Sequence, residues 1–149
     1  MKNVDSFADH AGSMDAINDV ISQLKRHEGF VGTVYNDSLG VPTIGYGINL
    51  KAGITEREAS MILEERVRKL RLKLPMVIRY WQRLSYKRQD VLINMAYQLG
   101  VSGLLKFKKM FINLENCWYD LAADEMLNSL WSVQTPERAL ELSEIMRNG

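Results

Sequence analysis

The chain has 149 residues, of which 46% are hydrophobic and 25% are charged, a composition typical of a globular protein with a buried core. No apolar run is long enough to cross a bilayer, so stable membrane insertion is not expected. Residues 1–12 lack the apolar core of a secretory signal peptide. Cys117 is the only cysteine and the two histidines lie far from it in the chain, so neither a disulfide nor a metal or cofactor site is expected.

The net charge of +1 conceals a segregation of charge along the sequence. Asp90 is the only acid between Arg66 and Lys109, whereas Arg138 and Arg147 are the only cations after Lys109. This asymmetry is compatible with affinity for an anionic partner, and equally with the solvated faces of helices. No nucleic-acid recognition motif accompanies the basic stretch, so no nucleic-acid partner is expected.

The predicted elements begin after residues 1–12, which have no sustained periodicity and which we interpret as a mobile leader. Ser13 is a candidate N-cap for a first helix, and Gly29 is a typical C-terminal stop. Glu28 then falls in the last turn, where the negative end of the helix dipole disfavours an acid. Its position therefore indicates a role other than helix stability.

From Phe30 the hydrophobic period shortens and predicts a small β-hairpin. Strands are expected at residues 33–35 and 41–46, around a turn with the sequence Asn36-Asp37-Ser38-Leu39-Gly40. Glycines at positions 40, 45 and 47 indicate tight backbone geometry or the close approach of a ligand.

Helical patterns dominate the rest of the chain. The sequence Thr55-Glu56-Arg57-Glu58 matches a capping box that opens a long helix, which we expect to stop before Pro75. Further helices are predicted at residues 77–84, 86–99, 104–114, 118–130 and 136–146, the last with Thr135 as N-cap and Pro136 at its first position. The apolar positions of these helices predict a set of core residues: Trp81, Met95, Met110, Trp118, Met126 and Trp131.

These elements predict an α+β fold in a single domain at residues 13–149. A small β-hairpin lobe is expected at about residues 30–54, and a long helix joins it to a larger all-helical lobe. That larger lobe is expected at about residues 75–149, together with the first helix.

Three residues around the hairpin are candidates for acid–base chemistry. A hairpin that folds back towards the preceding helix can bring Glu28, Asp37 and Thr43 around one cleft. Glycoside hydrolysis needs an acid that protonates the leaving oxygen and a carboxylate that activates water or stabilises a positively charged transition state. A hydroxyl beside that carboxylate can help to hold the water. By spacing alone, however, acids at a helix end and in a turn are more often simply solvated.

The residues around these three resemble the active-site segment of the phage lysozyme family, and are similar to its T-even phage form. The first motif comprises His27-Glu28-Gly29-Phe30, Tyr35-Asn36-Asp37 and Gly40-Val41-Pro42-Thr43-Ile44-Gly45-Tyr46-Gly47. Three further motifs follow in the family's order: Gly53-Ile54-Thr55 with Glu58-Ala59, then residues 92–100, then Trp131 with Gln134-Thr135-Pro136-Glu137-Arg138-Ala139. The resemblance implies a lysozyme-like fold.

It also implies that the enzyme hydrolyses the β-1,4 bond between N-acetylmuramic acid and N-acetylglucosamine in peptidoglycan, with inversion at the anomeric carbon. Glu28 would be the general acid, Asp37 the carboxylate that positions or activates water, and Thr43 its partner. Arg138 would support Glu28. Residues implied in substrate contacts are Asn49, Tyr97, Gln98 and Thr135. As purely structural alternatives, Tyr97 could be a core aromatic, Gln98 a helix-surface residue and Asn49 a loop cap.

Two departures from the family pattern affect the small lobe. Ile48 stands where the family has a histidine, so an ion pair between the lobes is missing. The stretch between Leu50 and Gly53 is much shorter than in the T-even form, which leaves the sugar contacts on that side open.

The expected partner is therefore the glycan strand of peptidoglycan, bound by a monomer. Without a signal peptide, the enzyme would reach the wall after release by another protein or by delivery in a virion. Three alternatives stay open at this stage: a lytic transglycosylase on the same fold, a non-enzymatic wall-binding or virion structural module, and, with less support, a zinc amidase.

Overall fold

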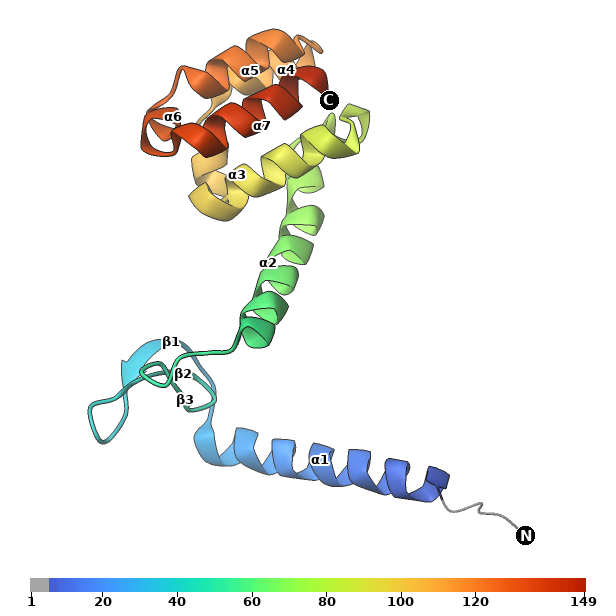
Figure 1. The fold of residues 1–149 in the computed structure, drawn as a ribbon, viewed down its shortest axis with the longest axis vertical. Coiled ribbons are helices and arrows are strands. Elements are labelled where there is room, and N and C mark those ends of the chain that lie inside the picture. The colour runs from blue at the N-terminus through green and yellow to red at the C-terminus, as the bar shows by residue number, and fades with distance from the viewer. Residues whose placement is uncertain (1–5) are drawn as a thin grey trace. The chain divides into compact units, whose positions relative to one another are not determined.

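The computed structural model describes the backbone of residues 6–149 and the side chains from Met14 onward. Part of the predicted leader, residues 1–5, lies outside the described residues, and the mobility of residues 1–12 stays a prediction. The chain divides into two compact units, Met1–Glu58 and Ala59–Gly149 (Figure 1). In the described part of the chain, no helix combines the length and apolarity needed to cross a membrane.

The first unit begins with helix α1 (Ser6–Glu28). The predicted start at Ser13 is wrong, because Gly12 and Ser13 are tolerated inside a helix at a modest cost and the backbone continues through them. The predicted end is confirmed. Gly29 adopts a φ of +67° and its N–H donates to the carbonyl of Lys25 at 3.1 Å, which closes the last turn.

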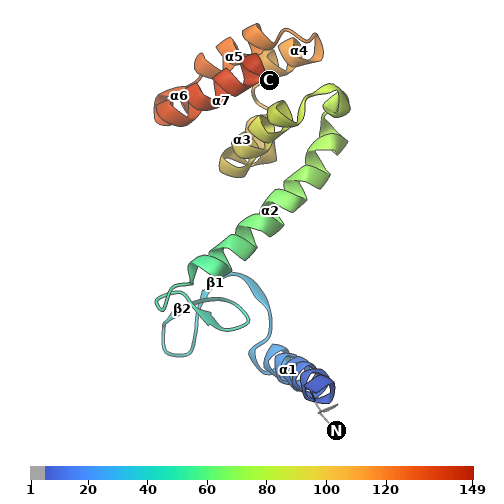
Figure 2. The ribbon, with the colours of Figure 1, turned by 45° about the vertical axis from the view of Figure 1, so that its right-hand side comes forward.

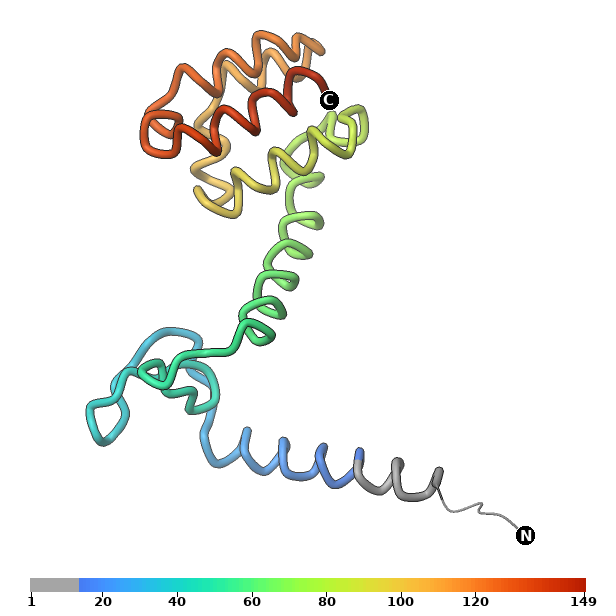
Figure 3. Tube along the Cα trace, viewed as in Figure 1, coloured from blue at the N-terminus to red at the C-terminus, as the bar shows by residue number. Residues whose placement is uncertain are grey.

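A three-stranded antiparallel sheet follows, in the order β1 (Val31–Asn36), β2 (Pro42–Gly45) and β3 (Ile48–Asn49). The hairpin of β1 and β2 is confirmed, and the tube in Figure 3 shows the chain turning back to add β3. In this register Thr43 lies on the central strand, between Tyr35 and Asn49. The two-residue β3 was not predicted, because its pairing with β2 is a tertiary contact that a two-residue pattern does not show.

Helix α2 (Glu56–Val77) starts with the predicted capping box. The N–H of Thr55 donates to Glu58 Oε2 at 2.7 Å, and the N–H of Glu58 donates to Thr55 Oγ1 at 3.2 Å. The hydrogen bond from the Thr55 backbone, followed by the one from its hydroxyl, lowers the pKa of the Glu58 carboxyl from its usual value. The predicted stop before Pro75 is wrong: the helix includes Pro75 in its last turn, and the N–H of Ile78 still bonds the carbonyl of Leu74 at 2.9 Å.

The rest of the second unit is helical. Its elements are the 3₁₀ turn η1 (Trp81–Arg83) and the helices α3 (Tyr86–Leu104), α4 (Lys108–Glu115), α5 (Tyr119–Leu127), α6 (Leu130–Gln134) and α7 (Pro136–Asn148). The helix predicted at residues 77–84 is thus reduced to one 3₁₀ turn. The one predicted at 118–130 is shortened to Tyr119–Leu127, and a separate short helix begins at Leu130. Helix α5 contacts both α4 and α7, and α3 packs on α7 (Figure 2).

The hydrophobic core of the described residues lies entirely in this second unit, between Leu74 and Met146. Five of the six predicted core residues are buried: Trp81, Met95, Met110, Met126 and Trp131. The prediction for Trp118 is wrong, since 54% of this residue is exposed. Helix α4 ends at Glu115, and Cys117 takes a φ of +60° in the turn that follows. Trp118 therefore falls at the N-cap of α5 and outside its packed face. The α+β lysozyme-like fold is confirmed.

Candidate active site

Glu28 is the last residue of α1, and its side chain is exposed. Its carboxyl group lies against the Cα of Gly47, in the turn between β2 and β3. A Cβ built at Gly47 would be only 2.5 Å from Glu28 Oε2 and 2.9 Å from its Cδ. The end of the helix and this turn are therefore in direct contact.

Tyr46, the neighbour of Gly47, holds the same turn to the end of α1 through two contacts. The ammonium group of Lys25 lies 5.6 Å from the centroid of the Tyr46 ring. The ring of Phe30, two residues after Glu28, packs on Tyr46 with 5.5 Å between centroids and a tilt of 53°. Lys25 and Phe30, which lie on either side of Glu28 in the sequence, thus both contact the β2–β3 turn through Tyr46.

Asp37 organises the β1–β2 turn with one of its two carboxylate oxygens. Asp37 Oδ1 accepts hydrogen bonds from the N–H of Leu39 at 2.9 Å and of Val41 at 2.8 Å. The backbone of Asp37 also pairs with Val41, whose carbonyl accepts from the Asp37 N–H at 3.0 Å. Because both of these side-chain hydrogen bonds use Oδ1, the second oxygen, Oδ2, is available to a substrate or a water molecule.

Thr43 is the one buried residue of the described sheet, with 4% of its surface exposed. Its hydroxyl donates to the carbonyl of Val41 at 2.8 Å. A hydroxyl whose proton is engaged in this way offers its lone pairs to an incoming donor, such as water. Asp37 and Thr43 are both hydrogen-bonded to Val41, so the backbone of this single residue couples the two side chains.

The three predicted catalytic residues are therefore all carried by the first unit. Asp37 and Thr43 are joined through Val41, and Glu28 touches Gly47, two residues beyond the end of the same strand β2. The glycine at 47 predicted tight backbone geometry or the close approach of a ligand. The tight geometry is confirmed by its φ of +72°, and the group found close to it is the side chain of Glu28.

The hydrogen bonds of Asn49 are those of a loop cap, the structural alternative to a substrate contact. Its side-chain oxygen accepts from the N–H of Lys51 at 2.9 Å and of Ala52 at 3.3 Å, so it caps the loop after β3. Its side-chain amide N–H groups have no hydrogen-bond partner among the described residues of the first unit. A substrate contact through that amide stays a prediction.

The remaining predicted residues belong to the second unit. Gln98 Oε1 accepts a hydrogen bond from Trp131 Nε1 at 2.8 Å, while its neighbour Tyr97 is 46% exposed. Thr135 occupies the N-cap position of α7 but does not cap it with its side chain. Its hydroxyl instead donates to the carbonyl of Trp131 at 2.9 Å, so the predicted side-chain cap is wrong. Trp131, which was predicted as a core residue and as part of a family motif, thus binds two of the predicted substrate-contact residues.

Arg138 lies on α7 with an exposed side chain, and no acid of its own described unit forms an ion pair with it. By contrast, Arg147 on the same helix is paired with Asp120 at 3.5 Å and with Asp124 at 2.7 Å. Arg138 is therefore free, within its unit, to serve another group.

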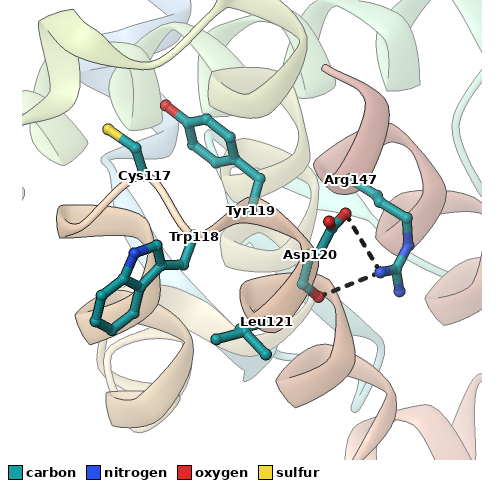
Figure 4. Close-up of a pocket in the computed structure, with 6 residues that line it drawn as sticks. All are labelled: Cys117, Trp118, Tyr119, Asp120, Leu121 and Arg147. Atoms are coloured by element: carbon teal, nitrogen blue, oxygen red, sulfur yellow. Dashed lines mark hydrogen bonds and ion pairs between the residues drawn. The ribbon is translucent and has the colours of Figure 1, made fainter.

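Two hollows of the second unit have none of the eight predicted residues in their lining. One, of about 450 Å³, is shown in Figure 4 and contains the Arg147–Asp120 pair; its lining is Cys117, Trp118, Tyr119, Asp120, Leu121 and Arg147. A larger one, of about 730 Å³, is bordered by Lys106, Lys108 and Lys109 and by the rings of Phe107 and Trp131. Each hollow is lined by a single carboxylate, Asp120 in the first and Glu125 in the second.

Comparison with known families supplies an independent assignment. The family model of phage lysozyme matches residues 25–141, a segment that includes all eight predicted site residues. The chain belongs to the phage lysozyme family. The resemblance inferred from the sequence motifs is thereby confirmed.

Individual relatives agree with this family. The chain is 30% identical over 155 aligned residues to the pre-baseplate central spike protein Gp5 of Enterobacteria phage T4, covering 85% of this chain and 27% of that protein. It is 35% identical over 69 residues to probable T4-type lysozyme 2 of Dictyostelium discoideum, covering 46% of this chain and 41% of that protein. Probable T4-type lysozyme 1 of the same organism is 33% identical over 75 residues. Each match spans less than half the length of the relative.

Proposed function

We propose that this phage lysozyme family member is a muramidase. It hydrolyses the β-1,4 bond between N-acetylmuramic acid and N-acetylglucosamine in peptidoglycan. The observation that carries the proposal is the coupling of Asp37 and Thr43 through Val41 in the same small unit that holds Glu28. A carboxyl group at the end of α1, a second one in the β1–β2 turn and a hydroxyl on β2 suit the acid–base cleavage of a glycosidic bond.

In the proposed reaction, Glu28 donates its proton to the glycosidic oxygen as the bond from that oxygen to the anomeric carbon breaks. A water molecule held between Asp37 Oδ2 and the Thr43 hydroxyl attacks the anomeric carbon from the opposite face and passes a proton to Asp37. The configuration at that carbon is inverted. Such a mechanism needs about 6.5–9.5 Å between the two carboxyl groups, which leaves room for the water.

The second unit would contribute the remaining contacts. We propose that Arg138 supports Glu28 and that Tyr97, Gln98 and Thr135 bind the glycan strand, with Asn49 binding it from the first unit. The bonds of Gln98 and Thr135 to Trp131 favour a fixed orientation for both side chains.

Digestion of purified sacculi by the wild type and by Glu28→Gln tests the proposal. Mass spectrometry of the released muropeptides should show hydrated reducing ends for the wild type, and at least about 100-fold less product for the variant, since a general acid contributes about 100- to 10,000-fold. Anhydro sugar ends would identify a lytic transglycosylase instead. Binding to sacculi without release of reducing ends would identify a wall-binding module, and inhibition by a chelator would indicate a zinc amidase.

We further propose that the enzyme reaches the wall as part of a virion. The similarity to a spike protein of phage T4 supports this route over release by another protein during host lysis. Detection of the chain in purified particles is the expected result, whereas its presence only in the lysate would contradict it.

A further inference from the structure

The turn between β2 and β3 contains two glycines, Gly45 and Gly47, with φ angles of +68° and +72°. Both avoid the strain that a side chain suffers in this backbone region. Only Gly47 meets a second constraint. A Cβ at Gly45 would lie 3.4 Å from Ile48 Cδ1, an ordinary contact, whereas a Cβ at Gly47 would collide with the carboxyl group of Glu28.

The collision at Gly47 would have to be relieved by movement of one partner. The turn is held against the end of α1 by Lys25 and Phe30 on the ring of Tyr46, so its backbone is the more constrained side. The carboxyl group is the free end of a flexible side chain and has no hydrogen-bond partner within its described unit. Glu28 would therefore move, by about 1 Å, to restore a normal separation.

We propose that Gly47 is a positioning residue for the catalytic acid. Because Gly47 has no side chain, the Glu28 carboxyl group can lie directly against its Cα. This inference depends on the proposed function, in which Glu28 protonates the leaving oxygen. The absence of a side chain at position 47 therefore determines the position of the Glu28 carboxyl group from which the proton is transferred to the substrate. The contacts of Tyr46 with Lys25 and Phe30 hold the turn that contains Gly47 in place.

The test compares Gly47→Ala with a matched control, Gly53→Ala. Gly53 has nearly the same backbone angle, φ +74°, but an added Cβ would meet no atom within 4 Å. Both variants should therefore lose a similar amount of thermal stability from backbone strain. Only Gly47→Ala should lose kcat on peptidoglycan, by about 10- to 100-fold, because misplacement of a catalytic group by about 1 Å costs up to that much. Its KM should stay close to that of the wild type.

Glu28→Asp supplies a readout that a purely structural role would not change. Its shorter side chain withdraws the carboxyl group from position 47, so the loss of kcat caused by Gly47→Ala should be much smaller in the Glu28→Asp background than in the wild type. Independent, multiplicative effects of the two substitutions would overturn the proposal. So would equal kcat values for Gly47→Ala and Gly53→Ala.

If Gly47→Ala does not fold, Gly47→Asn replaces it, with Gly53→Asn as its control. Asparagine tolerates positive φ better than alanine but still carries a Cβ, so kcat should again fall only at position 47. Full activity of Glu28→Gln would refute the proposed function itself. An inactive Glu28→Gln combined with a fully active, folded Gly47 variant would refute the positioning role alone.

Discussion

In the second unit, side chains are fixed by burial: Leu92, Met95 and Met126 have no exposed surface and pack in one continuous core. The described part of the first unit contains none of that core, and its proposed catalytic side chains are held by other means. Asp37 and Thr43 are hydrogen-bonded to the backbone of Val41, and Glu28 rests on Gly47. Substitution of a buried core side chain in the second unit should therefore act mainly on stability, and substitution of a proposed catalytic side chain in the first unit mainly on activity.

The largest expected effect is the loss of activity in Asp37→Asn. The amide oxygen can still accept the hydrogen bonds of Leu39 and Val41, so the turn and the melting temperature should be preserved. A neutral amide cannot take a proton from water, and kcat should fall by about 100- to 10,000-fold. Reducing-end release and thermal melting measure the two properties. Undiminished activity would show that Asp37 only shapes the turn.

Leu92→Ala should have the opposite profile. The removal of a fully buried leucine side chain from α3 should lower the free energy of unfolding by about 2–5 kcal/mol. The kcat of the enzyme that remains folded should be unchanged. The same substitution at Leu140, which is 55% exposed on α7, is the control and should cost less than about 0.5 kcal/mol. A selective loss of kcat in Leu92→Ala would contradict the separation of roles.

Gln98→Met tests a residue that binds Trp131 in the second unit and that is also proposed to bind the glycan strand. Methionine has a similar size but offers no strong acceptor, so Trp131 Nε1 loses its partner and the free energy of unfolding should fall by about 1–3 kcal/mol. If Gln98 also binds the glycan, KM rises as well. The double variant with Trp131→Phe removes the unpaired donor and should recover part of the stability, but not the KM. Unchanged stability in Gln98→Met would show that the bond to Trp131 contributes nothing.

Much of the helical unit could be predicted from the sequence, because capping boxes and apolar periodicity are local signals. The start of α2 at Thr55 and the end of α1 at Gly29 follow from side chains within a few residues of each boundary. A helix end was predicted wrongly where packing in the core outweighed a local stop signal in the sequence. Pro75 lies in the last turn of α2, between the buried Leu74 and Ile78, and the helix continues through it into the core.

The motifs indicate Glu28, Asp37 and Thr43 as candidate catalytic residues, but the contacts that hold these side chains could not be predicted. Periodicity and spacing do not reveal that Val41 links Asp37 to Thr43, nor that Tyr46 is held by Lys25 and Phe30. These contacts join segments whose approach depends on the twist and register of a short sheet. The glycines at positions 45 and 47 were the one sequence signal that indicated close contacts in this part of the sheet.

The anomeric configuration of the first product tests the account most directly. Proton NMR can follow the digestion of a soluble glycan fragment before mutarotation equilibrates the new reducing end. If Asp37 and Thr43 deliver water to the face opposite the bond that Glu28 protonates, cleavage of a β-linkage releases the α-anomer first. Initial formation of the β-anomer would contradict the account, because it would require a covalent or substrate-assisted intermediate that the proposed roles do not provide.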